Sequence, residues 1–233
     1  YRQTFRRGTP DGGLVDDGAV QNRRGTTIRF MPDADIFGEA AFSPARLYKL
    51  VRSKAYLFRG VRLHWRCEAA LPAGDDTIPA DCDLHFPGGL ADYLTEALSG
   101  RTMATQDMFT GDASFPDQKG RVEWAIAWPE FGDGFANTYC NTVPTAQGGT
   151  HEAGLRMALL KGLRAYGDLT GVKKATQLIT DDVTNGAAIM LSVFIPEPQF
   201  QGQTKEKLAT PETARLVEQA VRDPLDHWLG ENP

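Results

Sequence analysis

The sequence predicts an α+β fold in two parts. Strand patterns and helix patterns are mixed along the chain without the strict strand–helix–strand rhythm of a parallel sheet. The 233 residues suffice for one large domain or two ordinary ones. Pro-Gly-Gly at 87–89 combines two residue types that break regular structure, and it follows a predicted sheet edge. We therefore predict two domains, residues 1–88 and residues 89–233.

Hydrophobic alternation predicts the strands of the first part. The opening residues YRQTFRRG are expected to lie in a strand, and residues 25–33 alternate, with Ile28 and Phe30 on one face. The stretch VRLHWRCE at 61–68 alternates most clearly. Its inward positions are Val61, Leu63, Trp65 and Cys67. The chain is predicted to return through CDLHF at 82–86 as the second strand of a hairpin. Between the strands at 25–33 and 61–68, Ser43 and Pro44 predict a helix to about residue 55, with Ser43 as N-cap.

The second part is predicted to alternate less regularly between helices and strands. A helix is expected from Leu90 to Gly100, and another from Thr150, with Thr150 as its cap and Glu152 in its first turn. The stretch AAIMLSVFIP at 187–196 has one polar residue and is predicted to be a central strand. The other expected elements are strands at 122–128 and 138–145 and a helix at 211–222 that Pro224 bends.

The glycine-rich stretch GGTHEAG at 148–154 has two interpretations. Free backbone N–H groups at the start of a helix favour an anion, so the stretch resembles a phosphate-binding loop. However, it matches neither the dinucleotide-binding nor the P-loop spacing. The alternative is structural, with the glycines forming a tight strand-to-helix turn. A zinc-protease helix is excluded, because HEAGL has Leu155 where that motif requires a second histidine.

Two further constellations have a structural alternative that we favour. His64, Cys67, Cys82 and His85 have the local spacing of zinc ligands. Residues three apart in a strand point to opposite faces, so the two cysteines are expected in a hairpin core and the two histidines outside. The paired carboxylates Asp181 and Asp182 lie in ITDDVTNG, a composition typical of a turn or loop.

The net charge, the cysteine count and the hydrophobic runs exclude some classes of protein and indicate a cellular compartment. A net charge of −5 gives no global basic bias toward nucleic acid, although a local basic patch remains compatible with it. Three cysteines without a framework pattern favour a reducing compartment, and we expect a cytoplasmic protein. The sequence contains no apolar stretch long enough to span a bilayer, so no membrane partner is expected. The chain lacks a starting Met, and we interpret it as a piece of a longer protein.

Four motifs together resemble one known family. GTTIRFMPD, TVPTAQGGTHEAGLR, ITDDVTNGAAIMLSV and PEPQFQGQTKEKL occur in the order and spacing found in the B subunits of bacterial type IIA topoisomerases. The resemblance covers nearly the whole chain. It implies the C-terminal part of a GHKL ATPase α/β sandwich followed by a transducer domain with a ribosomal-protein-like α+β fold. The stretches FSPARLYKLVRSKAYLFRGV and DPLDHWL, and TNGA in place of REGL at 184–187, resemble the topoisomerase IV branch more than the gyrase branch.

The resemblance assigns roles to three residues. It implies that Lys205 contacts the γ-phosphate of ATP, that Gln203 makes a neighbouring phosphate contact, and that Thr26 lies beside the adenine pocket. The interpretations from residue type alone are a solvated loop lysine and a β-branched strand residue. The general-base glutamate, the Mg²⁺-binding asparagine and the ATP lid of the family have no match in these residues. We therefore expect this chain alone to be inactive, with Mg²⁺ ligands outside it.

The resemblance also implies the function of the whole enzyme. Its B subunits would dimerise on ATP, join the A subunits of topoisomerase IV in a heterotetramer, and couple ATP hydrolysis to passage of double-stranded DNA, decatenation and relaxation. One alternative is the gyrase B subunit, which adds negative supercoils. The other is a non-enzymatic nucleic-acid-binding module, which the arginines near the start of the chain favour and the acidic total disfavours. These arginines are Arg2, Arg6, Arg7, Arg23 and Arg24.

Overall fold

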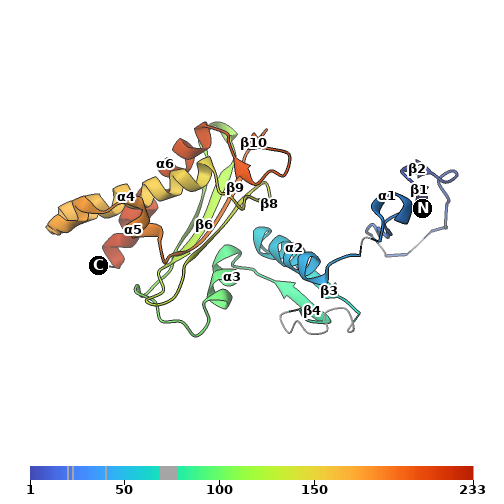
Figure 1. Ribbon diagram of the computed structural model, residues 1–233, viewed down its shortest axis with the longest axis horizontal. Coiled ribbons are helices and arrows are strands. Elements are labelled where there is room, and N and C mark those ends of the chain that lie inside the picture. The colour runs from blue at the N-terminus through green and yellow to red at the C-terminus, as the bar shows by residue number, and fades with distance from the viewer. Residues whose placement is uncertain (20, 23, 40, 69–77, 233) are drawn as a thin grey trace. The chain divides into compact units, whose positions relative to one another are not determined.

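The computed structural model describes residues 1–19, 21–22, 24–39, 41–68 and 78–232 (Figure 1). The chain divides into two compact units, Tyr1–Ser43 and Pro44–Pro233, and each is described by itself. The boundary predicted between residues 88 and 89 lies inside the second unit. It stays a prediction about domain organisation.

The Tyr1–Ser43 unit contains little regular structure. The strand predicted at the opening is a small antiparallel hairpin of β1 (Phe5–Arg6) and β2 (Thr9–Pro10), followed by the short helix α1 (Ala34–Phe37). The strand predicted at 25–33 is wrong: these residues are irregular, and Ile28 is 80% exposed. A strand needs a neighbour to hydrogen-bond with, and among the described residues of this unit none pairs with this segment.

A five-stranded mixed sheet organises the Pro44–Pro233 unit. Its order is β5-β6-β9-β7-β8, so β9 is central, antiparallel to β6 and parallel to β7. The strands are β5 (Phe109–Ser114), β6 (Arg121–Ala127), β7 (Phe135–Cys140), β8 (Val143–Pro144) and β9 (Ala188–Phe194). This confirms the predicted central strand and the strand near 122–128, whereas β5 was not predicted. The single strand predicted at 138–145 is wrong: the chain turns at Asn141 and Thr142, both with positive φ, and β8 runs back antiparallel to β7.

Both faces of the sheet are covered, which explains why β9 is apolar except for the buried Ser192. Helices α4 (Thr150–Thr170) and α6 (Glu212–Glu231) pack on one face, where Ile189 and Leu191 join their core (Figure 1). The other face packs against a second core. That core contains Met190 of β9 and residues of α2 (Pro44–Leu57), α3 (Leu90–Ala97) and the hairpin of β3 (Arg62–Arg66) and β4 (Asp81–His85). Alternate residues of β9 thus serve opposite cores.

Two predictions need correction: the end of α6, and the turn or loop predicted at 181–182. Helix α6 continues through Pro224 to Glu231, beyond the predicted end at 222. Leu225 and Leu229, beyond the proline, are buried, and this burial offsets the missing backbone N–H. Asp181 and Asp182 lie in the first turn of a short helix, α5 (Thr180–Thr184), where a turn or loop was predicted. The Asp182 carboxylate accepts a hydrogen bond from the Ile179 N–H, which stabilises the helix start.

The hairpin of β3 and β4 bears out the predicted alternation around the four candidate zinc ligands. Cys67 and Cys82 are half-buried free thiols packed against the second core. His64 and His85 are exposed, and His64 Nδ1 lies 3.0 Å from an oxygen of Asp83, its partner across the strands. The cysteines and histidines therefore lie on opposite faces of the hairpin.

The remaining short elements connect the larger ones. They are the 3₁₀ turns η1 (Pro116–Gln118) and η2 (Lys173–Gln177), and the strands β10 (Phe200–Gln201) and β11 (Lys207–Leu208). In the part of the chain that the structure describes, no helix has the length and hydrophobicity needed to cross a bilayer.

Candidate functional site

The Gln-Thr-Lys segment forms the tip of a small hairpin. Strands β10 and β11 pair antiparallel, and residues 202–206 connect them. Gln203, Thr204 and Lys205 are all exposed, so an amide, a hydroxyl and an ammonium are presented to solvent side by side. Lys205 has a backbone φ of +58°, in the left-handed region that residues other than glycine rarely adopt. Its ammonium lies 5.8 Å from the ring centroid of Phe200 in β10.

The base of this hairpin is attached to the turn that opens α4. The Leu208 side chain is 1% exposed, and its N–H donates to the Gly148 carbonyl at 3.0 Å. Gly149 and Leu208 form a parallel bridge. The Gln147 N–H donates to the Glu206 carbonyl at 2.8 Å, and the Gln147 side-chain amide donates to the Glu206 carboxylate at 2.8 Å. These bonds hold the base of the hairpin against the start of α4, and they leave its tip exposed.

The glycines of GGTHEAG allow close backbone approach. A Cβ on Gly149, whose φ is +140°, would lie 2.3 Å from the Leu208 carbonyl oxygen. A Cβ on Gly154 would lie 2.2 Å from the carbonyl oxygen of Ala214 in α6. Neither position has room for a side chain. These contacts favour the structural interpretation of the motif.

The start of α4 differs from the prediction at one residue. Gly149 is the N-cap, and Thr150, predicted as the cap, is the first helical residue. The close contact of Gly149 with β11 requires a residue without a side chain at the cap position. Glu152 lies in the first turn as predicted, and its carboxylate pairs with Arg156 at 2.7 Å. Glu152 thus already places a carboxylate at the helix start, where a phosphate would otherwise bind.

A buried polar chain lies behind this turn. His151 is fully buried, and its Nε2 lies 3.1 Å from the Thr145 hydroxyl oxygen, which lies 2.6 Å from that of Thr138 in β7. Burial lowers the pKa of His151 to about 4, because the charged imidazolium cannot be solvated there. The imidazole is therefore neutral near pH 7, and it links the first turn of α4 to the sheet.

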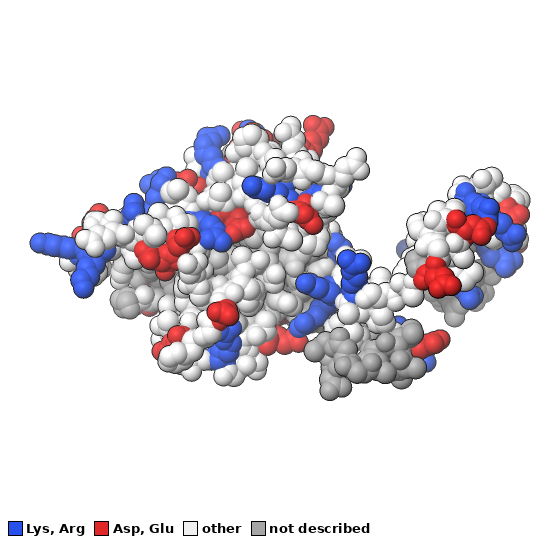
Figure 2. Space-filling model, in the orientation of Figure 1, with Lys and Arg blue, Asp and Glu red and all other residues white. Residues whose placement is uncertain are grey.

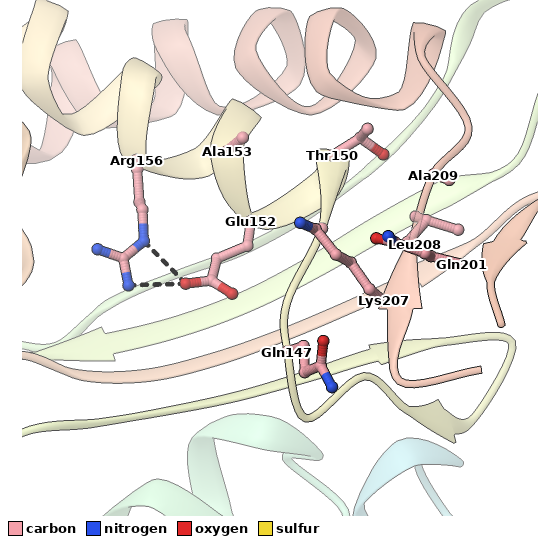
Figure 3. Close-up of a pocket in the computed structure, with 10 residues that line it drawn as sticks. Gln147, Thr150, Glu152, Ala153, Arg156, Gln201, Lys207, Leu208 and Ala209 are labelled. Atoms are coloured by element: carbon pink, nitrogen blue, oxygen red, sulfur yellow. Dashed lines mark hydrogen bonds and ion pairs between the residues drawn. The ribbon is translucent and has the colours of Figure 1, made fainter. Parts of the chain in front are cut away.

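A cavity of about 430 Å³ separates the hairpin from the first two turns of α4 (Figure 3). Lys207 reaches across it from β11, and the Glu152–Arg156 ion pair lies on the α4 side (Figure 3). Arg156 also donates to the hydroxyl of Thr184 in α5 at 2.6 Å. The lining residues are Gln147, Gly149, Thr150, Glu152, Ala153, Arg156, Gln201, Lys207, Leu208 and Ala209.

The structure brings together two of the three predicted site residues. Gln203 and Lys205 share the hairpin tip, whereas Thr26 is an exposed residue of the separate Tyr1–Ser43 unit. Sequence reasoning missed Gln147 and Glu206, the pair that attaches the tip. These residues are 59 positions apart, and no spacing rule connects them.

Charged residues do not gather into one basic surface on the face seen in Figure 2. Blue and red side chains are interspersed there over the Pro44–Pro233 unit. In the Tyr1–Ser43 unit, Arg7 pairs with Asp33 and Asp35, and Arg2 pairs with Asp17. These pairings weaken the case for a nucleic-acid-binding module based on the early arginines.

Comparison with known proteins identifies the class to which this fold and hairpin belong. Residues 89–233 match the DNA gyrase B family, and the chain belongs to that family. This confirms the predicted resemblance to the B subunits of type IIA topoisomerases.

A particular relative and two solved structures refine the likeness. The chain is 51% identical, over its full length, to the B subunit of DNA topoisomerase 4 from Bartonella bacilliformis, and it spans about a third (34%) of that relative. It matches the crystal structure of the B-subunit of the DNA gyrase from Myxococcus xanthus with a TM-score of 0.77 and 26% identity, covering 100% of this chain and 70% of that one. It matches the topoisomerase IV ATP binding domain of Francisella tularensis with a TM-score of 0.68 and 27% identity, covering 87% of this chain and 52% of that one.

Proposed function

We propose that this chain is part of the ATP-operated subunit of a type II topoisomerase of the topoisomerase IV kind, and that Lys205 senses the γ-phosphate of ATP. The observation that carries the proposal is an exposed ammonium on a hairpin tip whose base is attached to the main sheet unit. The relative's name and the ATP binding domain among the similar structures support the assignment.

The side chains at the tip fit a phosphate. An ammonium offers three donors and a compact charge to oxygens that gain negative charge as the terminal bond breaks. The amide of Gln203, two residues away, adds a donor for a neighbouring oxygen. A charge-assisted hydrogen bond of this kind contributes about 1.5–3 kcal/mol, which is the size of a typical coupling between two sites.

The remaining parts of the proposal come from the resemblance. Thr26 is assigned to the adenine side of the nucleotide site. The Mg²⁺ ligands are assigned to residues outside this chain. The proposed partners are a second B subunit, the A subunits of topoisomerase IV and double-stranded DNA, in the cytoplasm.

A gyrase B subunit is the second candidate, because the Myxococcus xanthus gyrase B-subunit has the same fold over the whole chain. The two candidates differ in the reaction of the assembled enzyme. In the presence of its cognate A partner, the topoisomerase IV assignment predicts decatenation and relaxation, whereas net negative supercoiling of relaxed plasmid would favour gyrase.

The test uses the full-length subunit with its A partner. Lys205→Ala is compared with Lys207→Ala, which removes the same charge from the same hairpin. We expect Lys205→Ala to retain binding of a non-hydrolysable ATP analogue and to lose about 10- to 100-fold in ATP turnover, the effect of one charge-assisted hydrogen bond, with a parallel loss of decatenation. Equal activity of wild type and Lys205→Ala would refute the proposed role.

A further inference from the structure

We infer that Gln147 is a positioning residue for Lys205, a role that rests on the proposed function. Gln147 makes two hydrogen bonds to Glu206, the residue that immediately follows Lys205. Its N–H donates to the Glu206 carbonyl, and its side-chain amide donates to the Glu206 carboxylate, both at 2.8 Å. Main chain and side chain of Glu206 are therefore held by a single residue from a different part of the chain.

The tip needs such an attachment because Lys205 has an unfavourable backbone conformation. A residue other than glycine in the left-handed region costs about 1–3 kcal/mol and persists only where its neighbours hold it. Strand β10, which precedes Lys205, and strand β11, which follows it, pair over two residues each. On the C-terminal side, the contacts of Glu206 with Gln147 come first, and the buried Leu208 follows two residues later. Glu206 is thus the attachment point nearest to Lys205.

Gln147 also connects the tip to α4. It directly precedes Gly148 and Gly149, which bond to Leu208 and cap the helix. A displacement of Glu206 therefore reaches the first turn of α4 through a single residue. Loosening this contact lowers the fraction of molecules whose Lys205 is in place, and the γ-phosphate contact weakens by the same fraction.

The experiment exchanges the partners of this hydrogen bond in the full-length subunit with its A partner. Gln147→Glu places a second carboxylate against that of Glu206, so the hydrogen bond is lost and the two charges repel. We expect ATP turnover to fall by about 3- to 10-fold, as for loss of an exposed hydrogen bond to a charged group. Adding Glu206→Gln restores an amide–carboxylate pair with reversed roles, and turnover should recover. Gln177→Glu makes the same chemical change at an exposed glutamine in η2 and should leave turnover unchanged.

Two readouts separate positioning from a general structural effect. The KM for ATP should change less than kcat, and Gln147→Glu should have no further effect in a Lys205→Ala background. If the double exchange fails to restore turnover, or if the effect persists without Lys205, the positioning role is overturned. If Lys205→Ala itself leaves ATP turnover unchanged, the proposed function fails as well. If Lys205→Ala lowers turnover and Gln147→Glu does not, the positioning role alone fails.

Discussion

The hydroxyl groups of Tyr56 and Tyr139 lie 2.6 Å apart in the core, although the two residues are 83 positions apart in sequence. Tyr56 lies near the end of α2 and Tyr139 lies in β7, so this bond joins the helix to the sheet. Burial raises the pKa of both phenols above the ordinary value, and they remain neutral hydrogen-bonding partners. Two residues earlier in α2, Lys54 donates to the Thr142 carbonyl at 2.7 Å and reinforces the same contact.

The tyrosine pair should behave non-additively when it is mutated. Tyr56→Phe or Tyr139→Phe alone leaves one buried hydroxyl without a partner, and each should destabilise the chain by about 1–3 kcal/mol. The double variant removes both hydroxyls and should be little worse than either single variant. Urea unfolding followed by tryptophan fluorescence measures this. Additive losses in the double variant would show that the hydroxyls act independently.

The Gly149–Leu208 contact should be intolerant of a methyl group. Gly149→Ala would place its Cβ against the backbone of Leu208, so β11 must move, and exchange of the Leu208 amide should accelerate at least about 10-fold. Gly202 is the control, because it also has a positive φ, +76°, but a Cβ there meets nothing within 4 Å. Unchanged Leu208 exchange in Gly149→Ala would contradict the close approach.

Two helical glycines should respond in opposite directions to alanine. Gly154→Ala forces α4 away from the Ala214 carbonyl of α6, and we expect a loss of about 1–3 kcal/mol from overpacking. Gly230 lies near the end of α6 with open space around it, so Gly230→Ala should be neutral or stabilising, by at most about 1 kcal/mol. Thermal unfolding of both variants checks the difference, and similar melting temperatures would disprove it.

The buried imidazole of His151 should make stability depend on pH. Its pKa is about 4 in the folded chain, below the value of 6.5 that an unperturbed histidine has when the chain unfolds. The unfolded state therefore binds more protons between these values, and stability is lost as the pH falls from about 6.5 toward 4. This residue alone should remove about 2 kcal/mol between pH 7 and pH 5. His151→Gln should flatten that part of the profile, and an unchanged slope would argue against a buried neutral histidine.

The central strand β9 and the long helix α4, which precedes it in the chain, were predictable because local pattern and tertiary environment agree. The apolar run at 187–196 has no stable place except between two covered faces, and β9 lies there. Leu155 and Leu159 repeat at helical spacing in α4, and both are fully buried. Residue type also predicted a solvated loop at Gln203 and Lys205, and both residues are exposed, although the β10–β11 hairpin that carries them was not predicted.

Other features depend on partners far away in sequence. The segment at 25–33 has the alternation of a strand, but a strand forms only with a neighbour to bond to. Pro224 signals the end of a helix locally, but burial of Leu225 and Leu229 continues α6 beyond it.

By itself, the sequence determined the α+β class, the central strand, the covering helix α4 and the polar loop around Lys205, because each depends on residues close together in the chain. Tertiary structure alone decided that Gly149 caps α4 against Leu208 and that Gln147 holds Glu206 beside Lys205. Those contacts join segments about 59 residues apart. They form only after the sheet has brought β11 to the start of α4, and no local pattern records where a distant partner will lie.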